Sequence, residues 1–133
     1  MTLYAILFLV VAMLAWVRLA PSNPARWHQP PQIAADKDFR SGAARLVETG
    51  PDGLARLDAI AMGTPRTTRL AGSVEDGMVT WITRSRLIGF PDYTTAQQEG
   101  EQLKIFARQR FGRSDLGVNR ARLQRWLGAL QGG

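Results

Sequence analysis

A chain of 133 residues has room for one domain. Its formal net charge of +6 favours nucleic acid, anionic lipid or an acidic protein as a partner. It contains no cysteine, which excludes disulfide bonds, thiolate metal sites, iron–sulfur clusters and cysteine nucleophiles. Fifteen of its seventeen basic residues are arginine, a bias that a GC-rich genome also produces, so the charge alone does not identify a partner.

Residues 1–20 predict a single transmembrane helix. The first 17 residues carry no charged side chain, and the apolar stretch reaches the roughly 20 residues that cross a bilayer as a helix. A cleaved signal peptide is the alternative, but Arg18 would occupy the −3 position of the cleavage site and Pro21 would follow the cut. We therefore expect an uncleaved anchor. Arg18 and Arg26 follow the helix, and by the positive-inside rule they favour a cytoplasmic domain.

Residues 21–37 predict an extended spacer between this anchor and the domain, because the segment contains four prolines. Trp27 is expected to be an interfacial anchor rather than a ligand-binding group. His28 is the only histidine of the chain, which excludes histidine-based catalytic triads and multi-histidine metal sites. No metal site and no cofactor are expected.

Residues 38–133 predict a small α+β domain. An antiparallel sheet is expected to be covered on one face by two helices, with Val79, Trp81, Leu103 and Ile105 in the core between them. Hydrophobic periodicity and turn residues predict strands at 44–49, 66–71, 79–88, 93–98 and 103–111, and helices at 53–62 and 118–130.

A set of arginines is expected on the face of the sheet opposite the helices. Strand alternation places four of them on adjacent strands, where they can form a patch for phosphate or carboxylate. Nucleic-acid binding would require aromatic side chains between these arginines on which bases can stack, and Phe106 is the one such residue of these strands. This argues against nucleic acid as the ligand. A solvated or ion-paired surface is the alternative. The candidate residues for binding an anion or a partner are Arg84, Arg86, Arg108, Arg110 and Arg113.

The turn that precedes the last helix is predicted to be structural first and a binding site second. Its glycines permit positive φ, and its short polar side chains can accept from the free N–H groups at the helix start. The residues of this turn are Gly112, Ser114, Asp115, Gly117 and Asn119. We expect Asp115 also to hold a neighbouring arginine. An alternative is acid–base chemistry by Asp92 and Asp115, which a deep, polar pocket between them would favour.

Two stretches carry a resemblance to a known family. Residues 84–95 read RSRLIGFPDYTT, and residues 107–127 read ARQRFGRSDLGVNRARLQRWL. Over residues 38–130 the chain resembles the bacterial and plastid family catalogued as domain of unknown function 1499, whose turn motif maps onto the residues from Gly112 to Asn119. The chain departs from the pattern at Gln109, where many members carry serine. The resemblance implies no activity, and it implies export, which favours the periplasmic side of the membrane.

Together these features predict a single-pass protein of the bacterial inner membrane. The leading hypothesis is a non-enzymatic accessory subunit or assembly factor of a larger membrane complex, in contact with membrane lipid. The second hypothesis is a domain that binds an anionic ligand or a lipid head group through the arginine face. An enzyme of unfamiliar type that relies on Asp92 and Asp115 is the third.

Overall fold

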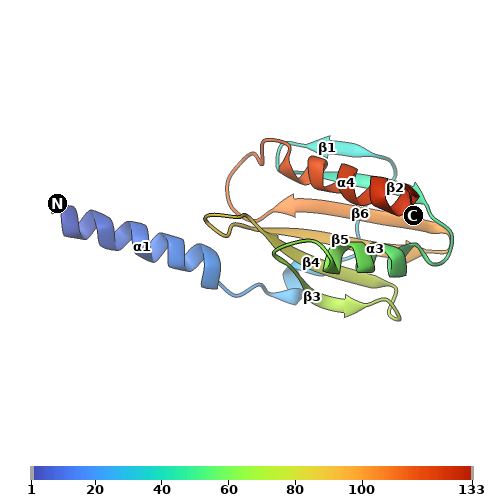
Figure 1. Cartoon of the computed structure of the whole chain (residues 1–133), viewed down its shortest axis with the longest axis horizontal. Coiled ribbons are helices and arrows are strands. Elements are labelled where there is room, and N and C mark those ends of the chain that lie inside the picture. Colours follow the sequence, from blue (N-terminus) through green and yellow to red (C-terminus); the bar gives the residue numbers. More distant parts are fainter. Residues whose placement is uncertain (1, 133) are drawn as a thin grey trace.

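The computed structural model describes residues 2–132 and shows an α+β domain with one long helix projecting from it (Figure 1). The helices are α1 (Leu3–Leu19), α2 (Pro24–Trp27), α3 (Gly53–Met62) and α4 (Val118–Gly132). The strands are β1 (Lys37–Phe39), β2 (Gly42–Glu48), β3 (Thr67–Ser73), β4 (Met78–Arg84), β5 (Pro91–Glu99) and β6 (Gln102–Gln109).

The strands form one sheet in the order β1-β2-β6-β5-β4-β3, and every neighbouring pair is antiparallel. Strands β3 to β6 are consecutive neighbours and form a meander within the predicted antiparallel sheet. Strand β2 lies beyond β6 rather than beside β3, because α3 carries the chain across the sheet between them. The first strand, β1, was not predicted.

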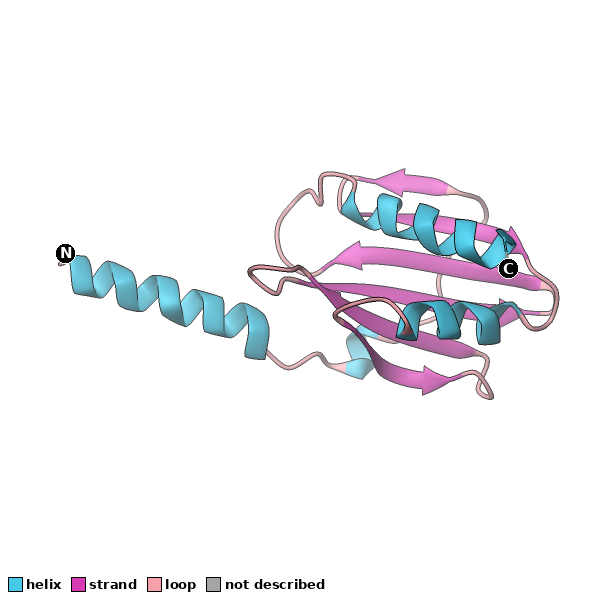
Figure 2. Ribbon diagram, viewed as in Figure 1, coloured by secondary structure: helices cyan, strands magenta, loops and turns pink. Residues whose placement is uncertain are grey.

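Helices α3 and α4 lie side by side on one face of the sheet, as the sequence predicted (Figure 2). The core between the two layers contains Leu57 from α3 and Leu123 and Trp126 from α4. Trp126 meets Trp81 of β4 edge to face, with ring centroids 5.8 Å apart. Burial of these aromatic and aliphatic side chains supplies most of the free energy that holds the helices on the sheet.

Strand β4 is shorter than predicted. The sequence predicted a strand over residues 79–88, but β4 ends at Arg84. Ser85 ends it because its Oγ accepts from the backbone N–H groups of Gly89 and Phe90, at 3.0 and 2.9 Å, and closes a loop. Arg86 consequently lies in this loop and not on the sheet.

The second face of the sheet is covered by residues 21–37, the proline-rich segment. The sequence predicted an extended spacer, but residues 24–27 form one helical turn, α2, which Asn23 caps by accepting from Ala25 N at 3.0 Å. Trp27 then packs against Tyr93 and Ile82. The segment therefore contributes a second, smaller hydrophobic cluster to the folded unit.

Helix α1 projects from one end of the domain, with its apolar side chains exposed. Thr2 caps its first turn by accepting from Ala5 N at 3.3 Å. The sequence predicted a transmembrane helix here. Within residues 2–132, however, no helix combines the length and the apolar character needed to cross a membrane.

Candidate functional site

Two places gather polar chemistry: the arginines under the proline-rich segment, and a buried network at the start of α4. At the first place, Arg108 donates to Thr95 Oγ1 at 2.8 Å, to the carbonyl of Phe106 at 3.0 Å and to the carbonyl of Trp27. Arg110 donates to the carbonyl of Pro21 at 3.0 Å. Both guanidinium groups thus bind backbone oxygens of the segment that crosses the sheet.

Two further arginines bind the chain where α1 meets the domain. Arg18, in the last turn of α1, donates to the carbonyls of Leu87 and Ile88 at 2.6 and 2.9 Å. In the opposite direction, Arg84 of the domain donates to the carbonyl of Val17 in α1 at 3.3 Å. Charged donors form hydrogen bonds about twice as strong as neutral ones. We call Arg18, Arg84, Arg108 and Arg110 the arginine clasp, because together they hold residues 17–27 against the domain.

The predicted arginine patch is not formed as expected. Strand β5 lies between β4 and β6, so Arg84 and Arg108 are not on adjacent strands. Arg86 and Arg113 are exposed in loops instead. Of the five arginines predicted to bind an anion or a partner, three therefore belong to the clasp and two remain at the surface.

A cavity of about 370 Å³ lies between the proline-rich segment and β6. Trp27 and Phe106 line it together with Arg26 and Arg108. No carboxylate pairs with Arg108 among residues 2–132, and burial lowers the pKa of its guanidinium to about 10. The cavity therefore combines an apolar wall with a buried cation that is satisfied by neutral oxygens.

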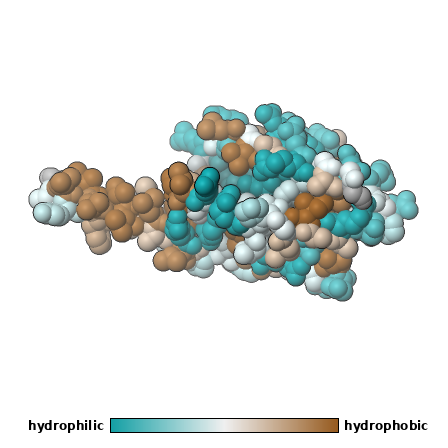
Figure 3. All heavy atoms as spheres, viewed as in Figure 1, coloured by the Kyte–Doolittle hydropathy of each residue, from teal (hydrophilic) through white to brown (hydrophobic). Residues whose placement is uncertain are grey.

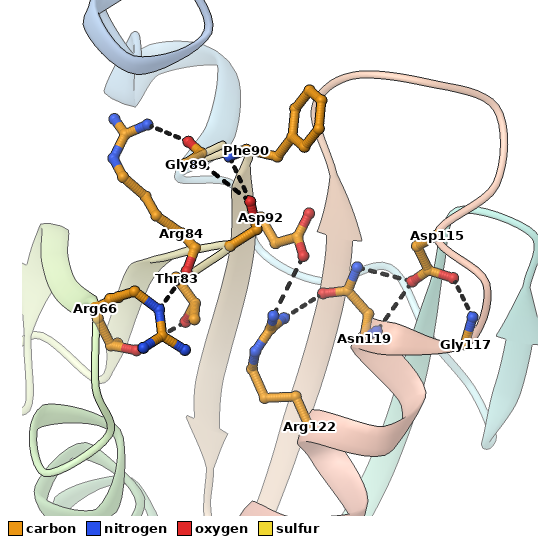
Figure 4. Close-up of polar contacts among 12 residues, drawn as sticks. Arg66, Thr83, Arg84, Gly89, Phe90, Asp92, Asp115, Gly117, Asn119 and Arg122 are labelled. Carbon is orange, nitrogen blue, oxygen red and sulfur yellow. Dashed lines mark hydrogen bonds and ion pairs between the residues drawn. The ribbon is translucent and has the colours of Figure 1, made fainter. Parts of the chain in front are cut away.

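The second place is the network at the start of α4 (Figure 4). The carboxylate of Asp115 accepts from the backbone N–H groups of Gly117 and Asn119, at 2.9 and 3.0 Å, and from Asn119 Nδ2 at 2.8 Å. It therefore caps the helix, as the turn residues predicted. The prediction that Asp115 also binds an arginine is wrong, because this carboxylate accepts its hydrogen bonds from the backbone of the turn and from Asn119.

A different aspartate pairs with a buried arginine. Arg122 donates to Asn119 Oδ1 at 2.6 Å and to Asp92 Oδ2 at 3.2 Å. The side chains of Arg122 and Asp92 are 6% and 13% exposed, so the ion pair is largely withdrawn from water. Burial raises the pKa of Asp92 although Arg122 opposes this effect, and burial lowers the pKa of Arg122.

The glycines of the turn have the conformations that the sequence predicted. Gly112 and Gly117 have φ of 92° and 82°, in the left-handed region that L side chains rarely adopt. Ser114 Oγ accepts from Leu116 N at 3.3 Å, which tightens the same turn. Leu116, by contrast, has φ of 55° although it is a bulky residue.

A cavity of about 400 Å³ lies between this turn and the 85–90 loop. Asp92 and Asp115 both line it, but Phe90, Phe111 and Leu116 contribute much of the wall. It is therefore not the polar pocket that would favour acid–base chemistry by the two aspartates. The carboxylate of Asp115 accepts from the backbone and from Asn119, whereas that of Asp92 accepts from Arg122.

A family model described as protein of unknown function (DUF1499) matches residues 17–130. The chain belongs to the DUF1499 family. The match confirms the resemblance read from the motifs, and it extends to residue 17, so the DUF1499 model includes the proline-rich segment that the clasp holds. A search of the curated proteins finds no match.

Sequence reasoning missed Arg122 as part of the site of this DUF1499 protein. Arg122 is not among the candidate residues named from the sequence, yet it is 5% exposed and binds Asp92. Its spacing from Asn119 and Trp126, three and four residues away, puts it on the same helix face as these buried residues. This spacing indicates a buried position for Arg122. It was overlooked because arginine usually lies at the surface.

Proposed function

We propose that this DUF1499 protein is a non-enzymatic accessory protein tethered by a single membrane-embedded helix, whose domain works at the bilayer surface next to a larger membrane complex. The observation that carries the proposal is the exposed apolar surface of α1. Phe8 is 71% exposed and Val11 is 56% exposed, and their neighbours around the helix are also exposed. A helix that is apolar all round requires a nonpolar environment.

The proposed anchor is shorter than a typical membrane-spanning helix. Its 17 residues rise about 25 Å, compared with about 30 Å for the hydrocarbon core. A small mismatch is accommodated by local thinning of the bilayer at a modest cost per ångström. Trp16 lies near the domain end of α1, where aromatic rings favour the membrane interface.

The arginine clasp supports the accessory role. A flexible linker would let the domain sample many orientations, whereas hydrogen bonds from Arg18 and Arg110 hold residues 17–27 on the sheet. A domain held in one orientation at the membrane can present a defined surface to a neighbouring subunit. The domain is proposed to lie on the periplasmic side of the inner membrane.

Alkaline carbonate extraction of membranes tests the anchor. The wild-type protein should remain in the membrane pellet, and Val11→Arg should shift a large fraction to the supernatant, because an arginine at the middle of a spanning helix costs about 3 kcal/mol. Val11→Leu is the matched control and should remain in the pellet. Release of the wild-type protein would refute the tether.

Gentle detergent extraction tests the accessory role. The protein should elute with a larger membrane complex during size-exclusion chromatography, and the complex should be recovered again when the tag is moved to the other terminus. A monomeric, partner-free preparation from native membranes would count against the accessory role.

A second candidate function is supported by the cavity beside Arg108. A carboxylate or phosphate with an apolar body would find the cations of Arg26 and Arg108 beside Trp27 and Phe106. Isothermal titration with benzoate and with inorganic phosphate tests this, and Arg26→Gln should weaken binding. Heat signals that are the same for wild type and Arg26→Gln would exclude this site.

A further inference from the structure

The cavity between the 85–90 loop and the turn before α4 lies at the end of the domain from which α1 projects. Arg18 of α1 binds the carbonyls of Leu87 and Ile88 in this loop, so the loop and the helix are joined directly. Figure 3 shows hydrophobic atoms on α1 and on the end of the domain beside it. The cavity therefore opens close to the proposed membrane surface.

In the polar part of the cavity, Asp92 offers a hydrogen-bond acceptor and Gln109 offers a donor. Asp92 and Gln109 are direct cross-strand partners on β5 and β6, so their side chains lie next to each other on the same face of the sheet. Asp92 uses Oδ2 to accept from Arg122, and its other oxygen points away from Arg122 (Figure 4). Gln109 Nε2 is buried and has no hydrogen-bond partner among residues 2–132.

The unpartnered amide matters because a buried donor without an acceptor costs free energy that a ligand can recover. Gln109 lines the cavity, and its Nε2 lies near Gly112, where an added Cβ would come within 3.6 Å of it. Nε2 therefore lies beside the turn, at the end of β6.

The rim of the cavity is apolar and in part strained. Leu116 is 92% exposed and has a φ of 55°, a conformation that is unfavourable for a bulky side chain. Phe90, which lines the cavity from the opposite loop, is 40% exposed. Neither side chain is buried in the fold, so packing within the domain does not account for a leucine in a left-handed conformation. Strain of this kind is characteristic of ligand-binding sites.

We propose that this cavity binds a single-chain amphiphile with a hydroxyl or un-ionised carboxyl head group, which enters from the bilayer beside α1. The head-group oxygen accepts from Gln109 Nε2, and its O–H donates to Asp92 Oδ1. The alkyl chain lies between Phe90 and Leu116 and extends over the rim towards the membrane. The inference rests on the proposed membrane tether, which places this end of the domain at the lipid surface.

Photolabelling of the full chain in phosphatidylcholine nanodiscs tests the inference. The probe is hexadecanol with a diazirine in its alkyl chain, and labelled peptides are located by mass spectrometry. We expect labelling of peptides that cover residues 85–92 and 109–118, in addition to α1. Excess hexadecanol or hexadecanoic acid should abolish the cavity labelling, whereas hexadecane, which lacks a head group, should not.

Two variants separate binding from folding. Gln109→Leu removes the unpartnered donor, so it should not lower the unfolding temperature, yet it should reduce cavity labelling about three- to tenfold. Leu116→Asn places a residue that tolerates positive φ in the turn, so it should preserve or raise stability while it reduces labelling. Gln124→Leu, at an exposed position of α4, is the control and should label like the wild type.

The outcomes distinguish the two proposals. Labelling of α1 alone would overturn the cavity site and leave the tether standing. Cavity labelling that hexadecane competes equally well, or that Gln109→Leu leaves unchanged, would also overturn it. Cavity labelling that needs Gln109 but occurs without labelling of α1 would support the site and refute the tether.

Discussion

The indole of Trp27 stacks on the phenol ring of Tyr93, with ring centroids 4.1 Å apart and ring planes 14° apart. Tyr93 is on β5, and its hydroxyl lies 2.6 Å from Ser22 Oγ. Two residues of the proline-rich segment thus engage one buried tyrosine. This contact makes the segment a packed layer on the second face of the sheet rather than a linker in solvent.

Replacement of Trp27 should therefore destabilise the domain. Trp27→Ala removes a side chain that is 9% exposed, and we expect the free energy of unfolding to fall by about 3 kcal/mol. Urea unfolding in mild detergent, followed by near-ultraviolet circular dichroism, measures it. Trp16→Ala is the matched control, because Trp16 is exposed on α1. Equal effects of the two substitutions would contradict the packed layer.

The cap formed by Asp115 gives a second prediction. Asp115→Ala should cost about 1 to 3 kcal/mol, because two backbone N–H groups and Asn119 Nδ2 lose their acceptor. Asp52 offers a matched control at the start of α3, where its side chain makes no capping hydrogen bond. Thermal unfolding of Asp52→Ala should differ little from that of the wild type. If Asp115→Ala melted like Asp52→Ala, the structural role of the turn would have to be abandoned.

The buried pair of Asp92 and Arg122 predicts strong coupling. Arg122→Met should cost about 3 kcal/mol, because it leaves the Asp92 carboxylate buried without its cation. The double variant Asp92→Leu/Arg122→Met should be more stable than Arg122→Met, since no buried charge remains. A double-mutant cycle from urea unfolding measures the coupling. Additive effects would show that the two side chains do not act as a pair.

His28 predicts a pH dependence of the packed segment. Its Nδ1 lies 2.7 Å from Thr80 Oγ1, and burial lowers its pKa below the usual 6.5. The unfolded chain therefore takes up a proton before the folded chain does. The stability due to neutral His28 is present above about pH 6.5 and is lost as the pH falls through the folded pKa.

The measurement is the unfolding midpoint of the wild type and of His28→Asn between about pH 7.5 and pH 5. The wild type should lose stability on acidification relative to the variant, which has no titrating group at this position. A difference between the two proteins that stays constant over this range would show that His28 does not carry the dependence.

The sequence predicted the sheet and the helix layer because alternating and helical periodicity depend on local pattern. Val79 and Trp81 alternate with Ile82 in the way that a two-sided strand requires, and all three are buried. The packing of the proline-rich segment was not predictable, since it depends on contacts between residues such as Arg108 and Trp27 that are far apart in the sequence. The same is true of Asp92 and Arg122, which tertiary structure alone brings together.

Of the candidate site, the sequence predicted the turn before α4 but not the contacts of the arginines. Turn chemistry is local, so the positive φ of Gly117 and the cap by Asp115 followed from residue types. The arginines were assigned to a patch by strand alternation alone. Their partners are backbone carbonyls such as that of Pro21, which no pattern of side chains reveals.

Depth measurements by electron paramagnetic resonance test the central claim, the membrane tether, most directly. Because the chain has no cysteine, nitroxide labels can be attached to the single substitutions Leu9→Cys, Leu87→Cys and Ala129→Cys in nanodiscs. Power saturation with oxygen and with a water-soluble nickel complex should place Leu9 in the hydrocarbon, Leu87 at the interface and Ala129, near the far end of α4, in water. A label at Leu9 that is as accessible to nickel as the label at Ala129 would contradict the account.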